Sequence, residues 1–159
     1  MKIRFLLALL ALLSPAILHA QPGPIPREID LGAHGRIVLG EPFDGLRSIA
    51  ELRENGLYAL RPGTFAGADS IHVALADGVV AAIHFTYAPE PDDFDRYVAN
   101  GTAAFGPPER WTRLPRTSGS IEYARWQDVD TRMELRLDTR PGRVTLTAVM
   151  FDRHLSAID

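Results

Sequence analysis

The chain has 159 residues, a formal net charge of −3, no cysteine, 13 glycines and 12 prolines. The lack of cysteine excludes thiol nucleophiles, cysteine-ligated zinc and disulfides. Its only lysine is Lys2, which we expect to be lost on export, so amine-dependent chemistries such as Schiff-base catalysis and a P-loop are excluded from the mature chain.

Residues 1–20 have the three-part pattern of an export signal. Lys2 and Arg4 carry charge, an apolar run follows, and Ala20 is a small residue at the expected cleavage point. The run is too short to span a bilayer. Cleavage after Ala20 removes two basic side chains and leaves 139 residues with a net charge of −5, enough for one domain. We therefore expect a soluble periplasmic or secreted protein without a membrane anchor or bound nucleic acid.

The first elements after the signal are an extended linker and a short helix. Residues 21–35 contain three prolines near their start and predict the linker, so the single domain covers 36–159. Residues 36–40 predict a short strand. Asp44 is a suitable N-cap for a helix running to about Asn55, and Gly56 would end it.

Residues 71–87 predict a β-hairpin, because apolar side chains alternate on both sides of Ala76-Asp77-Gly78. A two-residue turn at Asp77-Gly78 would place the two apolar sets on opposite faces. A three-residue loop over 76–78 would pair Val73 with Ala81 and join the sets into one apolar face. Burial therefore favours the three-residue loop.

The second half predicts another helix and an antiparallel sheet. The helix begins within 89–95, continues to about Ala104 and ends at Gly106-Pro107-Pro108. In the next strands, Ala124 and Trp126 face an apolar set across a tight turn at 128–130, and a loop over 138–143 precedes the last strand. The facing set consists of Met133, Leu135 and Leu137.

These elements predict an α+β fold in which two helices pack on one face of an antiparallel β-sheet. The order helix, loop and hairpin occurs twice, over 45–87 and 92–138, which is the pattern of a tandem αβββ repeat.

The turn at Phe105-Gly106-Pro107-Pro108, followed by a strand entry at Trp111, resembles small exported α+β modules. The order of elements is similar to that of the β-lactamase-inhibitor-protein type and of the SmpA/OmlA type of outer-membrane-assembly lipoprotein. The chain lacks the disulfides of the first and the acylated cysteine of the second. The resemblance implies a protein-binding role in the periplasm, and no site residue is carried over from it.

The outer face of the C-terminal sheet is the best candidate interface. Residues 109–143 hold eight arginines and six acids, whereas 27–96 hold six arginines and twelve acids. The predicted register sets Tyr123 opposite Arg136 and Arg125 opposite Glu134. Tyrosine and arginine are enriched in protein interfaces. The candidate interface comprises Tyr123, Arg125, Arg132, Glu134, Arg136, Thr145 and Thr147.

Three functions remain open at this stage. The first is a non-enzymatic module that binds a periplasmic or secreted protein and needs no cofactor. The second is an envelope hydrolase or metal-dependent enzyme, in which His72 and His84, diagonal neighbours in the predicted hairpin, begin a metal site. The third is a small-ligand carrier with a cavity lined by Phe94, Val98 and Phe105. The excluded chemistries and the interface favour the first.

Overall fold

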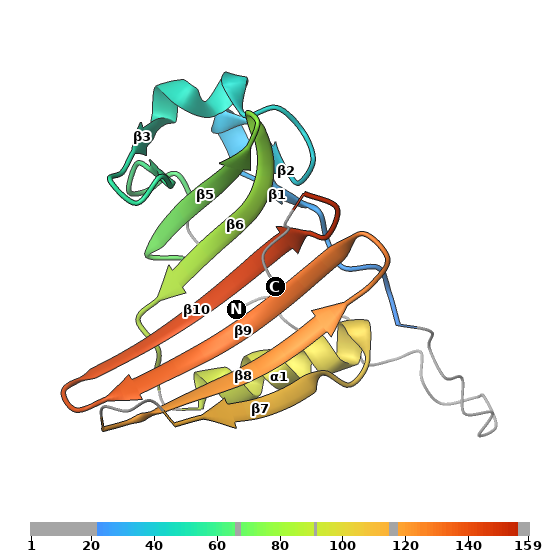
Figure 1. Ribbon diagram of the computed structural model, residues 1–159, viewed down its shortest axis with the longest axis vertical. Helices are drawn as coiled ribbons and strands as arrows, with labels where there is room; N and C mark the ends of the chain where they lie inside the picture. Colours follow the sequence, from blue (N-terminus) through green and yellow to red (C-terminus); the bar gives the residue numbers. More distant parts are fainter. Residues whose placement is uncertain (1–21, 66–67, 91, 115–117, 156–159) are drawn as a thin grey trace, which may run out of the picture.

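The computed structural model describes residues 22–65, 68–90, 92–114 and 118–155, so the predicted signal lies outside the described residues. Its main element is one eight-stranded antiparallel sheet made of two four-stranded meanders (Figure 1). The first meander runs through β3 (Ala50–Leu52), β4 (Tyr58–Leu60), β5 (Ser70–Ala76) and β6 (Val79–Tyr87). The second runs through β7 (Glu109–Arg113), β8 (Ser120–Gln127), β9 (Thr131–Arg140) and β10 (Arg143–Asp152). Pairing of β6 with β10 joins them.

One face of this sheet is apolar, because the register brings the alternating apolar side chains of five strands into common rows. One row crosses β5, β6, β10, β9 and β8 through Ile71, Phe85, Ala148, Leu135 and Ala124. The neighbouring row runs through Val73, Ile83, Met150, Met133 and Trp126. Each strand thus places every second residue on the same side.

Two groups of elements cover the apolar face. Over the first meander lie the two-stranded pair β1 (Glu28–Asp30) and β2 (Arg36–Val38), the 3-10 helix η1 (Gly32–His34) between them, and the 3-10 helix η2 (Asp44–Ile49). Over the second lies α1 (Asp93–Phe105), which passes behind β8 in Figure 1. Met133 and Ala148 pack against both core clusters, so the clusters are continuous.

The predicted α+β fold with two helices is wrong. The described part of the chain is mostly β, with 48% of its residues in strands and 17% in helices. Only α1 is an α-helix in the described part of the chain. The predicted αβββ repeat is absent there too, because each half of the sheet has four strands and the first has no α-helix.

The predicted helix over 44–55 fails after six residues. Asp44–Ile49 forms η2, in which only Leu46 is buried, and Ala50 turns the chain into the extended strand β3. A short helix gains too little from one buried side chain to offset its nucleation cost. Instead of continuing the helix, residues 50–52 form β3 and pair with β4 across a turn at Gly56. Gly56 has a φ of 80°, which glycine adopts without strain.

The hairpin of β5 and β6 forms, but its predicted three-residue loop is wrong. Ala76 pairs with Val79 across the two-residue turn Asp77-Gly78, in which both residues have positive φ. Such turns match the twist of a hairpin. A bulge then leaves Ala81 as an extra residue, because Leu75 pairs with Val80 and Ala74 with Ala82. The bulge restores the single apolar face that the three-residue loop was expected to provide.

Described residues of the predicted linker, 22–35, pack against the sheet. Ile25 and Leu31 are each 4% exposed, and Ile25 belongs to the core beneath α1. Arg27 anchors this segment through a 2.5 Å ion pair with Asp152, which is 3% exposed, and through a 3.1 Å hydrogen bond to the Leu39 carbonyl. Burial alone would raise the pKa of Asp152, but Arg27 and backbone N–H groups outweigh it and hold the pKa below its usual value.

We predict that Gly101→Ala destabilises the protein, although alanine normally stabilises a helix interior by about 0.5–1 kcal/mol relative to glycine. A Cβ at Gly101 would lie 2.6 Å from Cζ2 of Trp126, which is 4% exposed and is held by a 2.9 Å hydrogen bond from Nε1 to the Gly106 carbonyl. Overpacking should lower the free energy of unfolding by about 1–3 kcal/mol in urea denaturation. A gain in stability would contradict the close packing of α1.

We predict that the Arg27–Asp152 pair makes stability acid-sensitive. Because the folded pKa of Asp152 lies below its unfolded value, the ionised carboxylate stabilises the fold above the unfolded pKa, about 3.9. This contribution is lost as pH falls through the folded pKa. Asp152→Asn should lower the free energy of unfolding at pH 7 and flatten its dependence below pH 4, measured by denaturation across pH. If the free energy of unfolding of Asp152→Asn depended on pH as that of the unaltered protein does, Asp152 would not be the source of the acid sensitivity.

Candidate functional site

The second face of the sheet, here called the open face, is the candidate site. The covering elements β1, β2, η2 and α1 all contribute to cores on the apolar face. The alternate residues of β7 to β10 therefore point to the other side. They include all seven residues of the predicted interface.

Four residues of the open face form an arginine–aromatic ladder: Trp111, Tyr123, Arg125 and Arg136. Trp111 on β7 stacks on Tyr123 of β8, with ring centroids 4.7 Å apart and an interplanar angle of 4°. The Arg125 guanidinium lies 4.6 Å from the centroid of Trp111, and that of Arg136 lies 6.0 Å from Tyr123. Tyr123 is only 8% exposed. The solvent-accessible part of the ladder therefore consists of Trp111, Arg125 and Arg136, which are each partly exposed.

The register predicted for this face is confirmed. Tyr123 is opposite Arg136, and Arg125 is opposite Glu134. Arg125 donates through Nε and Nη2 to the same Glu134 oxygen at 3.2 and 3.1 Å, and lies 3.6 Å from a Glu109 oxygen. Thr147 follows in the same row as Arg136. The ion pairs fix the guanidinium that covers Trp111, so they hold the ladder in one geometry.

Arg132 occupies another part of the predicted interface. Its guanidinium lies 4.5 Å from the ring centroid of Phe151 on β10, directly across the strand pair. Its Nε is buried and has no hydrogen-bond partner among the described residues. The side chain is thus held mainly by stacking on an aromatic ring.

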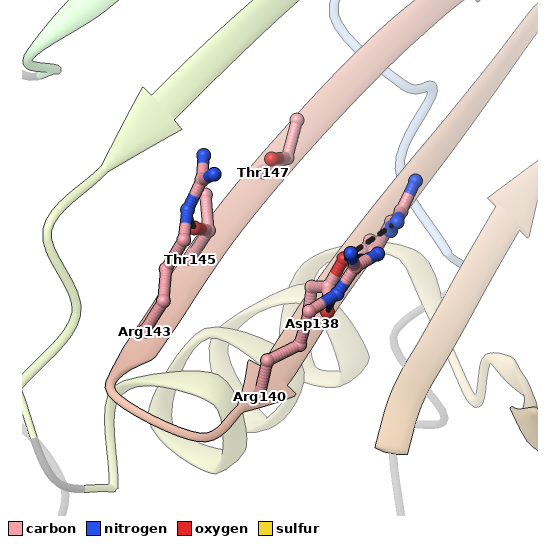
Figure 2. A pocket seen from close by; sticks show the side chains of 6 residues that line it. Asp138, Arg140, Arg143, Thr145 and Thr147 are labelled. Atoms are coloured by element: carbon pink, nitrogen blue, oxygen red, sulfur yellow. Dashed lines mark hydrogen bonds and ion pairs between the residues drawn. The ribbon is translucent and has the colours of Figure 1, made fainter. Parts of the chain in front are cut away.

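A basic hollow lies at the end of the β9–β10 hairpin, with a volume of about 260 Å³. Figure 2 shows its side chains in two rows, one from each strand, on the side of the sheet away from α1. The hollow is lined by Arg136, Asp138, Arg140, Arg143, Thr145 and Thr147. Hydrogen bonds first from Arg140 and then from Arg136 hold the pKa of Asp138 below its usual value, against the opposing effect of burial.

The sequence prediction missed three residues of this hollow because it placed a loop over 138–143. β9 continues to Arg140, and β10 begins at Arg143, with only Pro141-Gly142 between them. Gly142 has a φ of 74°, as the third position of a type II turn requires. The Pro-Gly pair was the signal that could have extended the strands and placed Asp138, Arg140 and Arg143 in the site.

His72 and His84, the candidate metal ligands, lie directly opposite each other rather than diagonally. The two-residue turn and the bulge at Ala81 each shift the register by one residue from the predicted one, so His72 pairs with His84 instead of Ala82. Burial first, and then the proximity of His72, lowers the pKa of His84. No group of three or more His, Asp or Glu residues suitable for a metal is formed within the described residues.

The predicted carrier stripe takes part in the core. Phe94 and Val98 are 5% and 7% exposed and pack in one cluster with Trp126 and Leu135, and Phe105 packs against it. These side chains fill the space that a cavity between helix and sheet would need.

Comparisons with protein-family models, curated proteins and solved structures gave no match. No helix in the described ranges has the length and apolar character needed to cross a membrane.

We predict that the two tryptophans differ sharply in their contribution to stability. Trp111→Ala removes a half-buried ring from an edge strand and a stacking contact, and should cost about 1 kcal/mol of unfolding free energy. Trp126→Ala empties a site that is 96% buried and should cost about 3–5 kcal/mol. Urea denaturation of both variants measures the difference, and equal losses would contradict the exposure of Trp111.

Proposed function

We propose that this protein is a non-catalytic binding module, exported to the periplasm or secreted, which docks an acidic surface of a protein partner onto its open face. The observation that carries the proposal is the arginine–aromatic ladder. Tryptophan, tyrosine and arginine are the residue types that most often dominate binding energy at protein interfaces. Here the ion pairs with Glu109 and Glu134 already hold Arg125 in place. Little side-chain entropy is then lost on binding.

Charge complementarity favours an acidic partner. On the β7–β10 part of the open face, arginines outnumber carboxylates by two to one, although the chain as a whole is acidic. The arginines are Arg113, Arg125, Arg132, Arg136, Arg140 and Arg143, and the carboxylates are Glu109, Glu134 and Asp138. A partner with exposed Asp and Glu side chains would be steered to this face at low salt.

The location rests on residues 1–20, whose charged start, apolar run and Ala20 support export. The absence of cysteine from the sequence is compatible with an oxidising compartment, where the fold would depend on its core alone.

The test compares partner capture by variants of the mature chain. Trp111→Ala removes a half-buried ring and Arg113→Glu an exposed charge from the open face, and neither residue forms an ion pair among the described residues. Arg125→Glu, in contrast, would add a third carboxylate beside Glu109 and Glu134 and disturb the fold. We expect the double variant to lose about tenfold or more in affinity for a stoichiometric partner taken from an envelope extract. Binding of the unaltered chain should weaken as salt rises.

Arg61→Glu is the matched control, because Arg61 is exposed on the first half of the molecule, in the loop after β4. It should keep the partner, and circular dichroism should show all variants folded. A partner retained equally by the double variant would refute the open face as the docking surface, and so would a partner lost equally by Arg61→Glu.

A further inference from the structure

The basic hollow contains a pair of like charges that folding alone does not explain. Arg140 and Arg143 are directly opposite each other across β9 and β10, next to the Pro141-Gly142 turn. Like charges in such a cross-strand position repel each other. Arg136 adds a third guanidinium four residues before Arg140 on β9, and Asp138 is the only carboxylate among the lining residues. The hollow therefore carries two uncompensated positive charges.

Asp138 holds two of the arginines in fixed positions. Arg140 donates to it through Nε at 2.9 Å and through Nη2 at 3.1 Å, and Arg136 donates through Nη2 at 2.8 Å. The Asp138 side chain is only 16% exposed, so the guanidinium groups cover the carboxylate. A guanidinium has five N–H donors, so both arginines keep donors for a ligand after binding Asp138.

The β10 side of the hollow supplies the remaining donors. Arg143 donates from Nε to Thr145 Oγ1 at 3.3 Å, which leaves the threonine hydroxyl proton free to be donated elsewhere. Thr147 is the next residue along β10 whose side chain lines the hollow (Figure 2). Pairing of β10 with β6 begins only at Leu146, so the hollow is not flanked by β6 at Arg143 and Thr145.

We propose that this hollow is a binding site for a phosphate-like oxyanion, held by Arg136, Arg140 and Arg143 with the hydroxyls of Thr145 and Thr147. A doubly charged tetrahedral anion balances the two excess positive charges and accepts several hydrogen bonds at once, as arginine clusters favour. The volume of about 260 Å³ is several times the roughly 30 Å³ share of one water, so a phosphoryl group with part of an attached molecule fits. This site does not rest on the proposed protein partner.

Titration with inorganic phosphate at constant ionic strength tests the site, with the arginine Nε–Hε signals followed by NMR. We expect saturable changes at Arg140 and Arg143. Arg143→Gln should weaken binding about tenfold, since a hydrogen bond to a charged group contributes enough free energy for such a change. Arg143 is the best position to alter because, among the described residues, its side chain hydrogen-bonds only to Thr145, whereas Arg140→Gln would also release Asp138.

Arg61→Gln is the control for the loss of one exposed positive charge, and it should change the affinity by less than about twofold. Thr145→Val should weaken binding without changing the net charge, which separates hydrogen bonding from general attraction. Absence of a saturable change with phosphate would overturn the proposal, as would an equal loss in Arg61→Gln and Arg143→Gln. Neither result depends on whether a protein partner is captured.

The source of the oxyanion is distinguished by a second arm with phosphatidylcholine vesicles, with and without phosphatidic acid. Sedimentation only with the phosphatidic acid vesicles, reduced by Arg143→Gln, would support the site with a lipid headgroup as the ligand. Saturable phosphate binding without sedimentation would support it with a soluble phosphate compound.

Discussion

The alternation of side chains across eight registered strands is the constraint on which this structure depends. A slip of one residue in any strand would carry its apolar side chains to the open face. The pairing of β6 with β10 is the critical place, because it aligns the rows of one meander with those of the other. The bulge at Ala81 has the same role within the first hairpin, since the two-residue turn alone would put Ile71 and Phe85 out of alignment. Both features keep all apolar rows on the side that α1 and the N-terminal segment cover.

The open face follows directly from this constraint. Once β1, β2, η2 and α1 cover the apolar side, the opposite side must remain compatible with water. The sheet meets this need with arginines stacked on aromatic rings, which shield Tyr123 to 8% exposure while their charged groups stay hydrated. A sheet face built in this way presents charged groups to water and also contains residue types that are enriched in protein interfaces.

The sequence allowed the second half of the sheet to be predicted better than the first. Alternation on both sides of a tight turn at Asp128 fixed the β8–β9 register, and with it the pairs Tyr123–Arg136 and Arg125–Glu134. The structure of the first half of the sheet depends on two features that the alternation of apolar residues does not reveal. One is the bulge at Ala81. The other is the 3-10 helix that ends at Ile49, because the pairing of β3 with β4 outweighs helix propensity. The sequence does not predict the basic hollow for a more local reason: a loop over 138–143 is expected, whereas Pro141-Gly142 forms a two-residue turn between two longer strands.

Repulsion among the arginines of the open face costs little folding free energy, whereas the same charges could strongly attract an anionic group. Arg140 and Arg143 are exposed, so water screens their repulsion and the fold tolerates it. Asp138 lowers that cost further by pairing with Arg140 and Arg136. When an anionic group enters and displaces water, the same charges act in a less polar environment, where their attraction for it is stronger. Screening by water in the free protein therefore explains how an acidic chain can keep a cluster of arginines at the end of one hairpin.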